Sequence, residues 1–335
     1  MTRSTPTQRY VCRLTLTLAV ALCPVCSTEV AVGQRRKKVE VPKVQRVTVN
    51  SKDGVAVRCN YYAGGVIESR SKKKKGEMEY KTRSGKEVVP IIMLHAWEGR
   101  GGEYDFLASY LQRKGHAVIV PDLRGHGDST TVRGDTKIKR ARPSVLLNAM
   151  VLDVDAVKKF LLNQNNEAKL NIEKLCVVGA ESGAIVAVNW AQHDWNWRQL
   201  PSFKQGRDVK ALVLLSPEQS FKGATLNQAI QHPVVRSKLS MMLISGQRDR
   251  KRHSEAKAIY SRLERFHQET TDSSSKDLYF LEPDAGLHGT QLVDRRVQSR
   301  LPVAQNIGVF IERRLLDMNE AFPWRERKSP LGAAD

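Results

Sequence analysis

The chain has 335 residues, with 55 Lys and Arg against 35 Asp and Glu, which gives a formal net charge of +20. A hydrophobic fraction of 41% is ordinary for a globular protein rather than a disordered one. The length suffices for one large α/β domain or two smaller ones with a sizeable core.

The N-terminus has the features of a secretory signal peptide. Arg3, Arg9 and Arg13 precede an apolar run at residues 14–23, which is too short to cross a bilayer as a helix. Small residues at positions 31 and 33 then offer a cleavage site before Gln34. We therefore predict a signal peptide over residues 1–33 and export to the periplasm or the extracellular space. The alternative is an uncleaved membrane anchor.

Cleavage after residue 33 would leave two cysteines, Cys59 and Cys176, in separate strand-like segments. A chain with so few cysteines is not built on disulfides. Cys176 lies in an apolar run and is predicted to be a small core residue.

The remainder is predicted to be one α/β domain at residues 45–320, between a basic linker at 34–44 and a C-terminal tail at 321–335. Strand patterns occupy residues 45–50, 54–63, 88–94, 116–121, 175–179, 209–215, 241–245 and 277–281. Helical patterns occupy residues 104–114, 144–163, about 182–190, 254–266 and 303–318. This alternation predicts a mainly parallel sheet with helices on both faces.

Two segments interrupt the alternation. Residues 69–86 are strongly charged and are expected to form an exposed loop. Residues 217–239 separate two core strands and leave room for only a minimal cap.

Four segments carry residues typical of a catalytic site. His95 ends a strand before a Gly-rich loop, and residues 122–129 read DLRGHGDS directly after the next strand. Residues 179–183 read GAESG, a tight turn between a strand and a helix. Asp249 follows a later strand, and His288 follows the last one. His95 and His126 are expected to be structural and to bond to backbone groups.

In this order the four segments resemble the α/β-hydrolase superfamily, in particular its esterases and lipases, over about residues 45–318. The resemblance implies the α/β-hydrolase fold, hydrolysis of ester, thioester or amide bonds, and no metal or other cofactor. It also implies a triad in the chain order nucleophile, acid, histidine. By position these residues are Glu181, Asp249 and His288, with oxyanion donors from the backbone N–H groups of Trp97 and Ser182.

The elbow departs from the family pattern, because Glu181 stands where a serine is usual. As a nucleophile it would resemble the aspartate of epoxide hydrolases and dehalogenases, with one extra methylene group. Ser182 could be the nucleophile only if the turn shifted by one residue, although the glycines bracket Glu181. Glu181 could instead be a general base toward water. In a noncatalytic site, Glu181 and His288 would form an ion pair, with Asp249 as a second carboxylate.

The excess of positive charge is concentrated in four clusters, at residues 35–38, 72–75, 133–142 and 248–252. Their simplest interpretation is a solvated surface. The alternative is contact with a small anionic substrate or an acidic envelope polymer. No nucleic acid partner is expected, since no binding motif or stacking aromatics accompany the lysines. No stable membrane span is expected after signal cleavage.

Overall fold

The computed structural model describes residues 39–70, 77–132, 136–137, 141–201, 203–267 and 276–328. The predicted signal peptide lies outside these ranges, as do residues 34–38 of the predicted linker and all or most of three of the four basic clusters. The chain from Val39 onward packs as one compact unit. Within the described ranges, no helix is both long enough and apolar enough to cross a bilayer.

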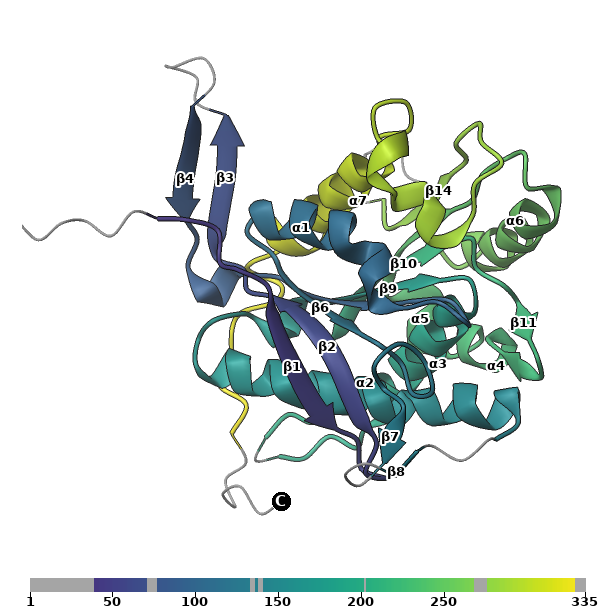
Figure 1. Ribbon diagram of the computed structural model, residues 1–335, viewed down its shortest axis with the longest axis horizontal. Helices are drawn as coiled ribbons and strands as arrows, with labels where there is room; N and C mark the ends of the chain where they lie inside the picture. The colour runs from purple at the N-terminus through teal and green to yellow at the C-terminus, as the bar shows by residue number, and fades with distance from the viewer. Residues whose placement is uncertain are drawn as a thin grey trace, which may run out of the picture. The chain divides into compact units, whose positions relative to one another are not determined.

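The main element is an eight-stranded sheet in the order β1-β2-β6-β5-β9-β10-β13-β14 (Figure 1). Its strands are β1 (Gln45–Asn50), β2 (Ala56–Tyr62), β5 (Pro90–Leu94), β6 (Ala117–Pro121), β9 (Leu175–Ala180), β10 (Val209–Leu215), β13 (Ser240–Ile244) and β14 (Leu278–Leu281). β2 pairs antiparallel with both β1 and β6, and every other pair is parallel. The predicted mainly parallel sheet is thus confirmed.

Helices cover both faces of this sheet, as predicted. α2 (Pro143–Asn166) and α3 (Ser182–Asn196) pack on one face, and α1 (Asp105–Arg113) and α7 (Val303–Ile311) pack on the other (Figure 1). A short π-helical segment, Glu312–Leu316, continues α7. Because both faces are covered, the central strands are continuous apolar runs rather than alternating ones.

α6 (Arg250–Glu264) packs along β13 and β14 and begins four residues before the predicted start. The reason is Asp249, whose carboxylate accepts a hydrogen bond from the Arg252 N–H and caps the first turn. Cys59 and Cys176 are both buried and unpaired, and burial raises the pKa of each thiol.

The expected loop over residues 69–86 is only partly correct. β3 (Val66–Arg70) and β4 (Met78–Thr82) pair antiparallel and form a separate two-stranded sheet (Figure 1). Their side chains are half-buried or exposed, and many are charged. The sequence therefore lacks the alternation of apolar and polar residues that is typical of a strand. Another short pair, β7 (Thr131–Val132) with β8 (Thr136–Lys137), follows the loop at residues 122–129.

The segment between β10 and β13 is small, as predicted. It holds a two-stranded hairpin, β11 (Ser220–Phe221) with β12 (Ala224–Thr225), and two short helices. These helices are α4 (Asn227–Ile230) and α5 (Pro233–Ser237).

A largely buried cluster of six charged side chains lies at the start of β10. Its members are Glu173, Asp194, Asp208, Lys158, Lys204 and Arg327. The Asp208 carboxylate lies 2.7 Å from Lys158 Nζ, 3.1 Å from Lys204 Nζ and 2.6 Å from Arg327 Nη1. Arg327 belongs to the predicted tail, so the described part of that segment packs against the domain.

Acid is expected to weaken this cluster. Burial raises the pKa of Asp208, but Lys158 and Arg327 outweigh burial and hold the pKa below its ordinary value. A carboxyl group with a depressed pKa in the folded state stabilises the fold above its unfolded pKa of about 3.9. Its contribution is lost as the pH falls through the folded value.

The urea midpoint should therefore fall when the pH is lowered from about 5 to about 3. The fall should be smaller in Asp208→Asn, which has no carboxyl group to titrate at this position. Equal falls in the two proteins would contradict the assignment to Asp208.

Candidate active site at the elbow after β9

The candidate site lies where the order of the strands reverses. β5 pairs with β6 on one side and with β9 on the other. The loops after β5 and β9 therefore meet at the carboxyl end of the sheet, the usual place for a ligand in an open α/β fold. His95 follows β5 directly, and Glu181 follows β9 directly.

Two glycines allow the chain to turn tightly around Glu181. A Cβ atom on Gly183 would lie 2.4 Å from the His95 carbonyl oxygen, and one on Gly179 would lie 2.6 Å from the Gly183 carbonyl oxygen. Glu181 has φ 50° and ψ −116°, a strained conformation for a residue other than glycine. Glu181, and not Ser182, therefore occupies the tip of the elbow, where the spacing of the glycines places it.

The Glu181 carboxylate is held by two cationic or potentially cationic side chains. Its Oε1 lies 2.9 Å from Nδ1 of His288. Its Oε2 accepts from Arg252, at 3.2 Å from Nε and 3.0 Å from Nη2. Both carboxylate oxygens are therefore engaged, and the side chain is only 16% exposed.

Gly289 is required next to this pair. It has φ +50°, and a Cβ atom there would lie 2.3 Å from Glu181 Oε1. Its N–H donates to the Ser216 hydroxyl group at 3.1 Å. The loop that carries His288 is thus fixed directly beside the elbow.

The Asp249 carboxylate binds Arg252. Its carboxylate accepts from the Arg252 N–H at 3.2 Å and from Arg252 Nη1 at 3.2 Å. Within the described part of the chain, no hydrogen bond or ion pair joins Asp249 to His288. The guanidinium group instead bridges Asp249 and Glu181. Burial lowers the pKa of Arg252, but the two carboxylates outweigh burial and raise the pKa above its usual value.

Ser182 is buried and points toward the loop after β5. Its Oγ accepts a hydrogen bond of 2.7 Å from the Trp97 N–H. This N–H is one of the two donors that the family resemblance assigns to an oxyanion hole. The Ser182 hydroxyl group therefore lies in a poor position for a nucleophile. It also engages the Trp97 N–H, which an oxyanion would need as a donor.

His95 and His126 are structural, as expected. The His95 ring is buried, bonds to the Ala96 carbonyl group at 2.7 Å, and accepts from the Leu123 N–H at 2.9 Å. Burial lowers its pKa, which suits the neutral ring that this acceptor role requires. His126 bonds to the Arg124 carbonyl group at 3.0 Å. The two histidines join the loops around the site.

The loop at residues 122–129 is organised by two polar side chains, the half-buried Asp122 and the buried Arg124. Asp122 accepts from the N–H groups of Gly101 at 2.7 Å and Asp128 at 2.9 Å. Arg124 is 4% exposed and pairs with Asp153, which is fully buried, and with Asp53. These contacts fix the loop against α2 and the turn after β1.

An aromatic group covers the Trp97 side of the site. The Trp97 ring centre lies 4.8 Å from that of His126 and 6.1 Å from that of Phe221 in the small hairpin. Lys222 Nζ lies 5.0 Å from the centre of the Trp97 ring.

Two residues of the site were missed by sequence reasoning. Arg252 was counted only as part of a basic cluster, although it lies one turn after Asp249. Glu218 follows β10, and its Oε2 is buried with no hydrogen-bond partner among the described residues. Burial raises the pKa of Glu218, and the nearby Glu181 carboxylate raises it further. A carboxyl group three residues beyond a core strand was the available signal.

Nothing in the described residues indicates a metal centre. No group of three or more His, Cys, Asp or Glu side chains within these ranges is arranged to hold an ion. The charges at the elbow are arranged as ion pairs between side chains.

Comparison with known proteins identifies the fold. A Pyrococcus furiosus esterase superposes with a TM-score of 0.54 at 18% identity, over 82% of this chain and 93% of that one. A Pyrobaculum calidifontis esterase gives 0.52 at 14% identity, over 82% and 85%. A Burkholderia pyrrocinia non-heme chloroperoxidase is 38% identical over 56 residues, which cover 17% of this chain and only 20% of that protein. The family model for the alpha/beta hydrolase fold matches residues 89–299. The chain belongs to the α/β-hydrolase fold family.

Proposed function

We propose that this protein is a noncatalytic, ligand-binding member of the α/β-hydrolase fold family. The observation that carries the proposal is the Arg252 side chain, which bridges Glu181 and Asp249. The guanidinium group pairs with the Glu181 carboxylate, which is then not free to act in catalysis. It also pairs with Asp249, the residue expected to be the triad acid.

The geometry argues against the covalent mechanisms. Both Glu181 oxygens already accept from charged or potentially charged donors. Attack by a carboxylate on an ester would also give a mixed anhydride, which makes Glu181 a poor nucleophile for the bonds this family usually cleaves. Ser182 is buried and bonded to the Trp97 N–H, and this contact also fills a donor of the oxyanion hole.

The geometry also disfavours general-base catalysis by Glu181. A general base needs an oxygen within hydrogen-bond reach of a water that can attack a substrate. Each Glu181 oxygen is instead paired inside the protein. The two esterases share 18% identity or less with this chain. This likeness supports a common fold and is too low to assign their activity to this protein.

The charge of the chain supports an anionic ligand or partner. The net charge is +20, and such an excess attracts anions over the whole surface. A small anionic molecule or an acidic polymer of the cell envelope fits this charge.

An aryl-ester assay tests the proposal. Wild type and the variants Ser182→Ala and His288→Ala should all hydrolyse p-nitrophenyl acetate at the rate of the buffer blank. Glu181→Ser should stay within a few-fold of the blank, because Trp97 and Asp249 remain engaged. Glu181→Ser combined with Ser182→Ala and Arg252→Ala frees both groups and should exceed the single variant.

Turnover by wild type well above the blank would overturn the proposal if it disappears in Ser182→Ala or His288→Ala. Turnover of an epoxide or alkyl halide, with solvent oxygen label trapped on Glu181, would instead establish a carboxylate nucleophile.

We further propose that the protein acts outside the cytoplasm. The arginines and the short apolar run of residues 1–33 support this. Mass spectrometry of the exported fraction should give a mature protein that begins at Gln34. Full-length protein found only in the cytoplasm would contradict export.

A further inference from the structure

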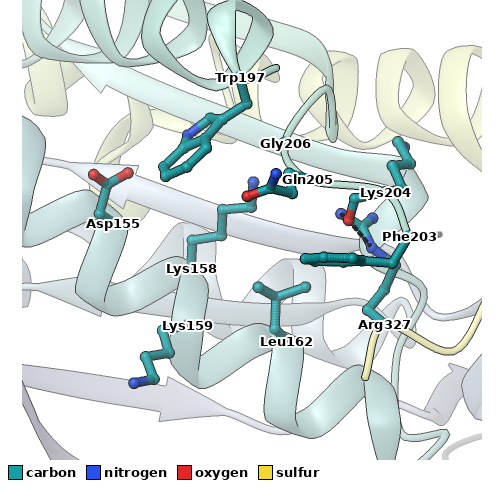
Figure 2. Close-up of a pocket in the computed structure, with 10 residues that line it drawn as sticks. All are labelled: Asp155, Lys158, Lys159, Leu162, Trp197, Phe203, Lys204, Gln205, Gly206 and Arg327. Carbon is teal, nitrogen blue, oxygen red and sulfur yellow. Dashed lines mark hydrogen bonds between the residues drawn. The ribbon is translucent and has the colours of Figure 1, made fainter. Parts of the chain in front are cut away.

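A cavity lies between the carboxyl-terminal half of α2 and the segment after α3 (Figure 2). Its volume is about 260 Å³. Its lining residues are Asp155, Lys158, Lys159, Leu162, Trp197, Phe203, Lys204, Gln205, Gly206 and Arg327. None of them belongs to the motifs from which the elbow site was inferred.

This cavity is remote from the elbow. α3 begins at Ser182, beside Glu181, and ends at Asn196, just before Trp197. Its 15 residues span about 22 Å at 1.5 Å per residue. The cavity therefore lies at the amino-terminal edge of the parallel strands, and the argument for it is independent of whether the elbow catalyses a reaction.

The apolar walls come from three separate segments. Leu162 belongs to α2, Trp197 directly follows α3, and Phe203 lies in the loop after it. Figure 2 shows the three around Lys158 and Gln205. Trp197 is 43% exposed, a large apolar area to leave in contact with water.

The position of Trp197 is fixed by its surroundings. Gly206 has φ +60°, and a Cβ atom there would lie 2.7 Å from Trp197 Cβ. The His193 ring meets the Trp197 ring edge to face, with centres 5.8 Å apart. An exposed, preorganised indole ring beside a hollow is typical of a ligand site.

Charge in the lining is strongly biased toward cations. Four of the lining side chains are cationic (Lys158, Lys159, Lys204 and Arg327), and one is a carboxylate (Asp155). The carboxylates that pair with three of these cations do not line the cavity. They are Glu173, Asp194 and Asp208, and they are buried. Only the cationic residue of each of these ion pairs is among the residues that line the cavity.

The Asp155 carboxylate already has two partners within the protein. It accepts from Trp190 Nε1 at 2.7 Å and lies 3.2 Å from His193 Nε2. The neighbouring Asp155 carboxylate raises the pKa of His193, which favours the cationic ring beside this carboxylate. Asp155 therefore opposes an anion less than a free carboxylate would.

We propose that this cavity binds a small amphipathic organic anion, with one flat apolar group and a carboxylate. The flat group packs against Trp197 and Phe203, and the carboxylate faces the cationic lining. The cavity is slightly smaller than most sites for drug-sized ligands, which suits a molecule with one or two rings.

The probe for this proposal is 2-naphthoate, with 2-naphthamide as a neutral molecule of the same shape. Titration calorimetry on the full chain should show binding of one equivalent of naphthoate, with the amide bound about ten-fold more weakly. Naphthoate should also quench tryptophan fluorescence. Trp197→Ala should weaken naphthoate binding about ten-fold, and Lys159→Gln about three-fold.

Matched control variants remove an exposed aromatic side chain and an exposed lysine elsewhere on the surface. Phe266 is 41% exposed and Lys257 is exposed, so Phe266→Ala and Lys257→Gln should leave the affinity unchanged. Circular dichroism verifies that each variant is folded. Equal affinity for the acid and the amide would overturn the proposal, as would absence of binding to wild type. Equal losses in Trp197→Ala and Phe266→Ala would overturn it as well.

Discussion

Replacing Arg124 with alanine is expected to lower the free energy of unfolding by about 3–5 kcal/mol. The guanidinium group bonds to Asp153 at 3.0 Å through Nε and 2.7 Å through Nη2. Asp153 is fully buried, and burial raises its pKa more than Arg124 lowers it. Removal of Arg124 would leave this carboxylate buried without its cation, which is why the cost is large. Urea unfolding monitored by circular dichroism measures the change.

Two matched variants separate the buried pair from a general loss of charge. Arg296→Ala removes an arginine whose side chain is 87% exposed and paired with Asp294, and it should leave the urea midpoint almost unchanged. Arg124→Leu combined with Asp153→Leu removes both buried charges and should recover much of the loss. A loss below about 1 kcal/mol in Arg124→Ala would show that the pair does not hold the loop.

Gly183→Ala is expected to destabilise the protein by about 3 kcal/mol. The added Cβ atom would lie 2.4 Å from the His95 carbonyl oxygen and 2.5 Å from that of Leu94. Both atoms belong to the backbone at the end of β5, so neither can move away as a flexible side chain would. The helix after the elbow must therefore shift from the sheet. The thermal midpoint should fall by several degrees.

Gly286→Ala is the control for the glycine substitution. Its Cβ atom would meet only the Arg248 side chain, at 3.9 Å, and Gly286 does not need a positive φ. Its stability should stay within about 0.5 kcal/mol of wild type. If Gly183→Ala were equally stable, the close contact between the elbow and β5 would be absent in solution.

Much of the architecture could be predicted because it follows from periodicity and spacing. The apolar runs that became β9 and β10 are fully or almost fully buried, and burial on both faces makes such runs continuous. The glycines at 179 and 183 place Glu181 at the tip, because a side chain at Gly183 would collide with the end of β5. These are properties of the backbone, which local sequence specifies well.

The chemistry of the elbow could not be predicted in full, because it depends on where side chains point. Asp249 has the right place in the chain for a triad acid, yet it caps α6 and binds Arg252. An arginine has several rotatable bonds, and its direction is decided by partners from distant segments, here Glu181. The contact between Ser182 and Trp97 joins positions 85 residues apart and leaves no local pattern.

The hydrogen bond from Trp97 to Ser182 affects which substitutions could make the elbow catalytic. A single substitution of Glu181 by serine would leave the Trp97 N–H bonded to Ser182 and the Asp249 carboxylate bonded to Arg252. If the proposed function holds, hydrolysis at this site would therefore need changes at three positions, Glu181, Ser182 and Arg252. The proposed noncatalytic role would thus rest on contacts on either side of Glu181 as well as on Glu181 itself.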